Sequence, residues 1–424
     1  ALSFRFSSEL YYITELVSTI YKIKRTEADI TDYKYFNNIE IPKSTNPQPW
    51  PFHKNFNNVG ETKDLDALHT KYGTVAFLII KNDSIWHEKY FDGYSEDSFS
   101  NSFSMSKSIV SAVMGKAIQD GFFEGLDDKV GNYFDEYKDG FASKLTIGDL
   151  SSMSSGMKWT ENYTNIFGVT ARAYIGSGLN ELILSRPIIK EPGKGFKYLS
   201  SDTQLLSMTI EKATKRKISD LVFDWFWDPI GAENSALWQV DNAKTNNEKA
   251  YCCFNSNARD FAKIGKLYKD NGFWNGVSIL NENFIKKSLN NRFESSPEYG
   301  YGFWLGFFEE KKFFSMRGHL GQYVIVFPKE NIIIVRLGKT HDKKTENEKF
   351  SKDFYKYIEE TFAMINSWNL KETQLLKVVK LNVSISGKPI LKNISFGLKK
   401  NETLGFVGES GSGKSITALS ITSL

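Results

Sequence analysis

Strand-like segments near both ends of the sequence enclose a long middle part with mostly helical patterns. On the N-terminal side, TVAFLIIKNDSIWHEKYFDGY reads as two strands joined by a turn at Asn82-Asp83. On the C-terminal side, YGYGFWLGFF, KKFFSMRG, QYVIVFP and NIIIVRLGK are rich in β-branched and aromatic residues. Residues 122–290 are mostly helix and loop. Because a sheet buries its faces against helices or another sheet, this order predicts an α+β fold: an antiparallel sheet flanked by helices, next to an all-helical lobe.

The order of patterns divides the chain into four parts. Residues 1–64 form an extension, with an amphipathic helix over SSELYYITELVSTIYKIK followed by the proline-rich IPKSTNPQPWPFHK. Residues 65–368 form the main domain, which ends in a helix over NEKFSKDFYKYIEETFAMI. Residues 369–373 are a linker. Residues 374–424 begin a new strand-rich pattern that ends in a glycine-rich loop and the first turns of a helix.

Composition disfavours several classes of function. The net charge of +4 is a mild imbalance, which argues against a nucleic acid partner. Cys252 and Cys253 are adjacent, so we expect neither a disulfide framework nor a metal site. The sequence has no apolar run long enough to span a membrane and no visible signal peptide. It does not indicate an oligomeric state.

The stretch SNSFSMSKSIVSAV places a serine and a lysine at the start of a helix predicted from about Ser104 to Gln119. The Ser-x-x-Lys spacing puts Ser104 and Lys107 one turn apart on one helix face. A serine hydroxyl becomes a nucleophile when a neighbour accepts its proton, and a buried lysine with a lowered pKa can do so. The N–H groups at the helix start would stabilise an oxyanion. The alternative is a solvated lysine on a surface helix.

Two further motifs fit the same chemistry. GKGFKYLSSDTQLL carries Tyr198-x-Ser200 before another predicted helix, and a phenol near a lysine can act as a general base. RGHLGQYVIVFP carries His319-x-Gly321 at the edge of a strand, where the glycine would let a substrate approach the backbone. The alternatives are ordinary core packing for Tyr198 and a structural role for His319.

The three motifs, in this order, resemble those of the serine β-lactamase and penicillin-binding-protein superfamily. The resemblance covers about residues 65–366, and within the superfamily it is greatest to class C-like hydrolases, which include esterases and 6-aminohexanoate-dimer hydrolases. It implies a β-lactamase-like fold and hydrolysis of a small-molecule amide or ester with no cofactor. A non-catalytic penicillin-binding-like module would have the same fold and is an alternative.

The resemblance also implies a role for each site residue. Ser104 would be acylated, Lys107 would take or relay its proton, and Tyr198 would be the general base that also protonates the leaving group. The backbone N–H groups of Ser104 and Gln322 would form the oxyanion hole. The remaining substrate-binding residues would be Ser200, His319 and Gly321.

Two of these positions depart from the superfamily's usual motifs. His319 replaces the lysine of Lys-Thr-Gly, and Ser200 replaces the asparagine of Tyr-x-Asn. Losing that lysine weakens the anchoring of a substrate carboxylate, which disfavours β-lactamase activity as the main role. The sequence offers no counterpart of the deacylating glutamate of class A enzymes.

A second motif lies near the C-terminus. GESGSGKS, residues 408–415, matches the P-loop pattern between a strand predicted over TLGFV and a predicted helix. Residues from 374 on resemble the start of a peptide-importer ATP-binding cassette, but this segment has no second acid for Mg²⁺ and no signature motif. ATP with Mg²⁺ is therefore a possible but not a favoured ligand. The candidate nucleotide-binding residues are Gly408, Gly411, Gly413, Lys414 and Ser415.

The two resemblances imply different functions and places. The favoured function is a serine hydrolase; the alternative is a nucleotide-binding subunit of a peptide transporter that carries the hydrolase-like region as a passenger. Hydrolases of this kind favour the periplasm or cell envelope, whereas a P-loop implies the cytoplasm. The location is therefore left open.

Overall fold

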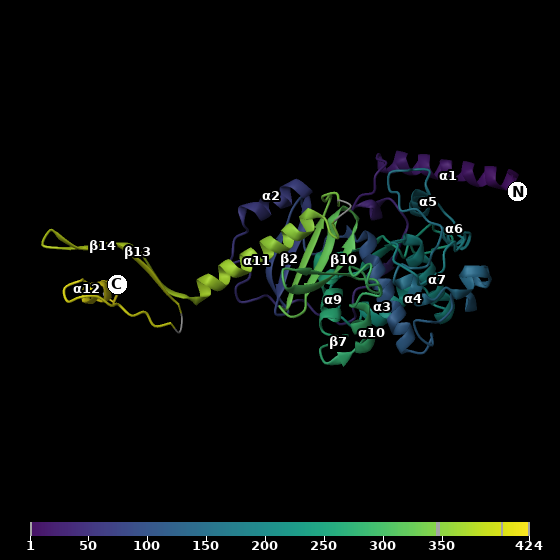
Figure 1. The fold of residues 1–424 in the computed structure, drawn as a ribbon. Coiled ribbons are helices and arrows are strands. Elements are labelled where there is room, and N and C mark those ends of the chain that lie inside the picture. The colour runs from purple at the N-terminus through teal and green to yellow at the C-terminus, as the bar shows by residue number, and fades with distance from the viewer. Residues whose placement is uncertain (1, 345–347, 400–401, 423–424) are drawn as a thin grey trace. The chain divides into compact units, whose positions relative to one another are not determined.

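The computed structural model describes residues 2–344, 348–399 and 402–422 (Figure 1). The chain forms two compact units: Ala1–Asn58 with Lys63–Ile358, and Val59–Thr62 with Glu359–Leu424. The predicted N-terminal extension is therefore not a separate part, because residues such as Ile30, Ile41 and Trp50 are buried in the core of the first unit. The division between the units falls within a long helix, α11 (Lys352–Thr373), and not in the linker predicted at 369–373.

The main sheet of the first unit has six antiparallel strands in the order β3-β2-β12-β11-β10-β9. Strands from both ends of the sequence meet in this sheet, because β2 lies beside β12. The predicted turn at Asn82-Asp83 is also present, and both residues have positive φ angles. The strands are β2 (Thr74–Lys81), β3 (Ser84–Tyr90), β9 (Trp304–Phe308), β10 (Lys311–Gly318), β11 (Gln322–Phe327) and β12 (Ile332–Gly338).

Helices cover both faces of this sheet. On one face lies α9 (Ala258–Lys269), where Gly265 allows a close approach: a Cβ atom there would lie 3.0 Å from a methyl group of Val324 and from one of Val326. On the other face, Phe354 at the start of α11 packs on Phe313 of β10. The sheet is therefore the middle layer of an α+β sandwich, as expected.

The helical lobe follows β3 in sequence. Its long helix α3 packs against α7 and α8. A small sheet, in the order β1-β5-β6-β4, joins the N-terminal residues to this lobe through pairs such as Asn38 with Gln239. The elements are β1 (Asn38–Ile41), β4 (Ser100–Asn101), β5 (Ala236–Gln239), β6 (Phe254–Ser256), α3 (Ser106–Gln119), α4 (Ile147–Ser151), α5 (Val169–Ile175), α6 (Leu179–Leu184), α7 (Ser200–Thr214) and α8 (Ile218–Val222).

The remaining elements of the first unit are peripheral. The described part of the N-terminal helix has buried Tyr12 and Leu16 on one side and exposed Leu10 and Val17 on the other. No helix in the described ranges is long and apolar enough to cross a membrane. These elements are α1 (Leu2–Ile23), α2 (Lys63–Tyr72), α10 (Glu282–Ser288) and the hairpin β7 (Phe273–Trp274) with β8 (Val277–Ser278).

The second unit contains a long hairpin, β13 (Gln374–Ile385) with β14 (Lys388–Lys399), and the short helix α12 (Lys414–Thr422). The strand predicted over TLGFV is wrong, because residues 402–409 have no regular structure. Such a strand needs neighbours on both sides and helices on both faces. Val407 is 94% exposed, so the described residues around it do not form such layers.

Candidate active site

Ser104 lies in a single 3₁₀ turn, Phe103–Met105, that leads directly into α3. Phe103 has a φ of +46°, a conformation that bulky residues rarely adopt. The Asn101 side chain fixes this turn, because its Oδ1 accepts a hydrogen bond from the Phe103 N–H at 2.9 Å. The Ser104 hydroxyl is thereby held, half-buried, at the entrance to the helix.

Lys107 is buried, with 3% of its surface exposed, and its amine contacts the serine. Its Nζ atom donates hydrogen bonds to Ser104 Oγ at 2.9 Å and to the Tyr251 carbonyl at 2.7 Å. Burial lowers the pKa of the amine to about 8, against an opposing influence from Glu161 and Asp202. Roughly a tenth of the amine is therefore neutral at pH 7. The alternative of a solvated lysine on a surface helix is therefore wrong.

Tyr198 also reaches the serine. Its ring lies 5.0 Å from Lys107 Nζ, and its hydroxyl is within hydrogen-bonding reach of Ser104. Burial raises the pKa of this phenol above its ordinary value, although Ser104 and Arg317 act in the opposite direction. The neutral phenol therefore dominates near pH 7, which leaves Lys107 as the group beside Ser104 that can accept a proton.

Glu161 belongs to the same group of residues and was not found from the sequence. It accepts hydrogen bonds from the backbone N–H of Ser200, from Ser200 Oγ at 3.2 Å and from the Tyr163 hydroxyl at 2.8 Å. The predicted contact of Ser200 with a substrate stays a prediction, while its bond to Glu161 is observed. A lone acid in the irregular stretch KWTENYTN has no spacing that would reveal this role.

His319 lies on the opposite edge of this group. Tyr163 stacks on its ring, with centroids 5.3 Å apart, and Phe103 meets it edge-on at 5.5 Å. Burial and the neighbouring His341 lower the pKa of His319 to about 4, so the imidazole is neutral near pH 7. It cannot supply the positive charge that the superfamily's third-motif lysine provides.

The structure shows why a glycine is needed at position 321. Gly321 has a φ of +80°, and a Cβ atom there would lie 2.3 Å from Arg336 Nη1. The Arg336 guanidinium donates hydrogen bonds to the carbonyls of Leu320 and Gly321 at 2.9 and 2.8 Å. The missing side chain therefore makes room for a buried arginine, and the predicted approach of a substrate to this glycine stays a prediction.

Gln322 lies at the start of an interior strand of the main sheet. It begins β11, which lies between β10 and β12, and its side-chain amide donates to the carbonyls of His319 and Gly338 at 3.1 and 2.6 Å. An N–H group in an interior strand points to a neighbouring strand. The predicted role of the Gln322 N–H in an oxyanion hole stays a prediction.

The end of β10 is the strand segment that borders the serine. Strand β9 begins at Trp304, opposite Ser315, so the last residues of β10 extend past it. At Gly318 a Cβ atom would lie 2.0 Å from the Ser102 carbonyl oxygen. The backbone of β10 and the turn that carries Ser104 are thus in direct contact.

Arg317 is a further residue that the motifs did not indicate. Its guanidinium lies among three aromatic rings, 5.0 Å from Trp304, 4.9 Å from Phe350 and 5.3 Å from Phe354. The Trp304 ring in turn lies 5.4 Å from Tyr198. Burial lowers the pKa of this guanidinium, but an arginine remains charged. It places a positive charge behind Tyr198.

The cysteines lie next to the catalytic group. Cys252 and Cys253 are bonded to each other through their sulfur atoms, and they follow Tyr251, whose carbonyl accepts the Lys107 bond. A bond between adjacent residues closes no larger loop, so it makes no disulfide framework. Within the described residues, no three His, Cys, Asp or Glu side chains come together as a metal site.

The glycine-rich loop lies in the second unit. Gly408, Gly411 and Gly413 all have positive φ angles. Lys414 Nζ donates to the carbonyls of Gly408 and Glu409 at 2.7 and 2.6 Å, so the amine occupies its own loop. Ser415 follows it in the first turn of α12 and is exposed. The predicted roles of these residues toward a nucleotide stay predictions.

Comparisons with known proteins agree with the fold. The 6-aminohexanoate-dimer hydrolase of Paenarthrobacter ureafaciens is 22% identical over 305 residues, which cover 67% of this chain and 77% of that protein. A Bacillus anthracis structure, provisionally called a 6-aminohexanoate-dimer hydrolase, superposes with a TM-score of 0.68 and 20% identity, over 81% of this chain and 93% of that one.

The C-terminal segment has a separate, short likeness. The glutathione import ATP-binding protein GsiA of Salmonella paratyphi A is 45% identical over 65 residues, or 14% of this chain. The chain spans about a tenth of the length of that relative.

The main domain matches a known family: residues 62–353 match the family described as "Beta-lactamase". The chain therefore belongs to the β-lactamase family, whose fold it shares.

Proposed function

We propose that this member of the β-lactamase family is a serine hydrolase that cleaves a small amide or ester through an acyl-enzyme on Ser104. The observation that carries the proposal is the 2.9 Å contact between Lys107 Nζ and Ser104 Oγ, made by an amine whose pKa is lowered to about 8. A nucleophile and a base in hydrogen-bonding contact form the core of such a site.

In the acylation step, neutral Lys107 takes the proton of the Ser104 hydroxyl as Oγ attacks the substrate carbonyl carbon. The carbonyl π electrons move to oxygen, and backbone N–H groups near Ser104 and the end of β10 stabilise the resulting oxyanion. Tyr198 then donates its phenolic proton to the leaving nitrogen or oxygen as that bond breaks. The Lys107 ammonium returns a proton to Tyr198, which restores both groups.

Deacylation uses the same groups. Water attacks the acyl carbonyl as neutral Lys107 takes its proton, the ester bond to Ser104 Oγ breaks, and the Lys107 ammonium returns that proton to Oγ as a carboxylic acid is released. Glu161 orients the start of α7 through Ser200 and sets the charge near Lys107. No cofactor takes part in this proposal.

The test is covalent labelling with a fluorophosphonate, followed by peptide mass spectrometry. We expect one adduct, on the peptide that contains Ser104, and loss of labelling and of esterase activity in Ser104→Ala. The melting temperature of that variant should stay within a few degrees of wild type. An adduct on another serine, or none, would contradict the proposal and would favour a non-catalytic module with this fold.

A nucleotide-binding function is a second candidate for residues 374–424. It is favoured by the P-loop pattern and the positive φ angles of its glycines. We propose at most weak binding of ATP with Mg²⁺, with Lys414 and Ser415 as the contact residues. This candidate is argued further in the last prediction below.

A further inference from the structure

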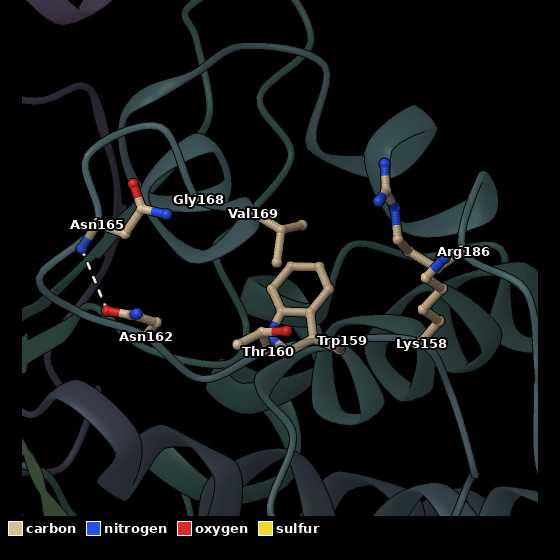
Figure 2. A pocket seen from close by; sticks show the side chains of 8 residues that line it. All are labelled: Lys158, Trp159, Thr160, Asn162, Asn165, Gly168, Val169 and Arg186. Atoms are coloured by element: carbon tan, nitrogen blue, oxygen red, sulfur yellow. Dashed lines mark hydrogen bonds between the residues drawn. The ribbon is translucent and has the colours of Figure 1, made fainter.

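A separate hollow lies beside the loop of residues 160–168, which also carries Glu161 and Tyr163. It has a volume of about 290 Å³, room for roughly ten water-sized groups. Asn162 and Asn165 of the same loop line it, together with Trp159 just before the loop (Figure 2). One short segment therefore borders both the candidate active site and this hollow.

The hollow is positively charged. Lys158 and Arg186 line it, and Figure 2 shows their side chains gathered on one side. Arg186 Nε donates to the Leu182 carbonyl at 3.2 Å, which holds the stem of the guanidinium. Among the described residues neither cation forms an ion pair, and the lining contains no acid. Two cations that share a cavity without an acid attract an anion.

The other walls combine the apolar Trp159 and Val169 with the polar Thr160, Asn162 and Asn165. The Trp159 side chain is 4% exposed, and Figure 2 shows its ring next to Val169, which also lines the hollow. Its indole Nε1 is buried and has no hydrogen-bond acceptor. A buried donor without a partner is unusual in folded proteins and commonly marks a place for water or a ligand. A ligand with a flat apolar group could lie against this ring while its anionic end pairs with Lys158 and Arg186.

We propose that this hollow binds a small organic carboxylate, with its apolar part on Trp159 and Val169 and its carboxylate between Lys158 and Arg186. Binding itself does not depend on the proposed function. An effect on turnover does, and it follows because Glu161 and Tyr163 lie on the loop that the ligand would contact. The hydrolase would then respond to carboxylic acids, the class of product that its own reaction releases.

The binding test uses benzoate as the probe and isothermal titration calorimetry as the readout. It is made on the full chain with Ser104→Ala, so that turnover plays no part. We expect saturable binding of benzoate, at least tenfold weaker binding of benzyl alcohol, and at least tenfold weaker binding of benzoate after Lys158→Gln with Arg186→Gln. Inorganic phosphate tests whether the charge alone suffices, and we expect it to bind more weakly than benzoate.

Three controls make the result decisive. Lys190→Gln removes an exposed lysine of the same region that does not line the hollow, and it should leave benzoate affinity unchanged. Trp159→Phe keeps an aromatic wall but removes the indole N–H, and it should weaken binding by a few-fold. Absence of benzoate binding, or equal affinity in the double variant, overturns the proposal, as does phosphate binding as tight as benzoate.

The turnover test uses the active chain and a neutral ester substrate. We expect benzoate to change kcat in wild type and to have no such effect in the Lys158→Gln, Arg186→Gln variant. If benzoate raises only KM, and does so equally in both proteins, it binds at Ser104 and the proposal is overturned. If Ser104 is never acylated, the proposed function fails while the calorimetric result still decides the binding site.

Discussion

The Nζ atom of Lys107 lies 2.9 Å from Ser104 Oγ, and burial lowers the pKa of that amine to about 8. Only the neutral amine can accept the serine proton. We therefore expect kcat/KM for a neutral ester to rise about tenfold per pH unit below pH 8 and to level off above it. A profile measured from pH 6 to 9.5 in constant ionic strength checks this. A flat profile, or one that falls with pH, would contradict Lys107 as the base.

The same contact predicts the effect of removing the amine. Lys107→Met keeps an unbranched side chain of similar length and should lower kcat by on the order of 10²- to 10⁴-fold, as for other positioned proton transfers. Lys116→Met is the matched control, because Lys116 lies on the same helix and pairs with Asp120 away from the site. It should leave kcat within a few-fold of wild type. Similar losses in both variants would point to a damaged helix instead of a lost base.

Glu161 should set the pH at which Lys107 works. Its negative charge raises the pKa of Lys107, so that Glu161→Gln, which removes the charge and keeps the shape, should lower this pKa further. The rising limb of the pH profile should then move to lower pH. Activity at pH 6 relative to pH 9 is the sensitive measure. A limb that stays in place would mean that the carboxylate acts only by holding Ser200 and Tyr163.

The sequence predicted the local parts of this site and missed the distant ones. Ser104 lies in the 3₁₀ turn that leads directly into the helix of Lys107, so their three-residue spacing brings them into contact. The contacts of Glu161 with Ser200, and of Gly318 with Ser102, join segments whose packing no local pattern encodes. A motif names residue types but not which neighbour fills the space beside them.

In the fold as a whole, a pairing between strands that are distant in sequence was also not predicted. The strands β11 and β12 are adjacent in sequence and were predicted, whereas the pairing of β1 with β5 joins Asn38 to Gln239 and was not. That pairing is why the N-terminal residues belong to the first unit. The segment TLGFV shows the converse error, because a strand was predicted there and the structure has none. A strand-like pattern stays irregular when the described residues around it supply no neighbouring strand and no covering helix.

Gly318 should be essential for the position of Ser104. A Cβ atom at Gly318 would lie 2.0 Å from the Ser102 carbonyl oxygen, and neither backbone can yield without moving the turn. Gly318→Ala should therefore reduce kcat/KM by more than tenfold. Gly125→Ala, where a Cβ atom meets nothing within 4 Å, is the control and should be nearly silent. Full activity in Gly318→Ala would show that this contact adjusts freely.

Lys249, which is not one of the catalytic residues, should make the stability of the fold depend on pH. It is fully buried, donates to the Tyr174 carbonyl and lies 4.7 Å from the Phe36 ring. Burial lowers its pKa to about 7, while the unfolded chain has the ordinary value of 10.5. Between these values the unfolded state binds more protons, so the wild-type free energy of unfolding should rise with pH.

The variant that isolates this effect is Lys249→Met. The difference in unfolding free energy, wild type minus variant, should grow by on the order of 1 kcal/mol per pH unit between pH 7.5 and 9.5. Urea unfolding at a series of pH values measures it. The subtraction removes the contributions of Lys107 and other groups common to both proteins. A constant difference across this range would mean that Lys249 stays charged in the folded protein, as it is in the unfolded chain.

The last prediction is that residues after Trp368 are dispensable for the hydrolase and do not hydrolyse ATP. Hydrolysis needs a carboxylate for Mg²⁺ and a group that orients water, in addition to the P-loop. The acids in residues 374–424 are Glu402 and Glu409, and both precede Lys414. Phe406 and Val407, which would be buried in a complete sheet, are 40% and 94% exposed.

The measurements are esterase activity, thermal unfolding and ATP binding in the full chain and in a chain cut after Trp368. We expect equal kcat/KM and an unchanged main unfolding transition, because the sheet and Ser104 belong to the first unit. Lys414→Ala in the full chain serves as the control for any nucleotide signal. ATP turnover that this variant abolishes, or loss of esterase activity on truncation, would show instead that the two units work together.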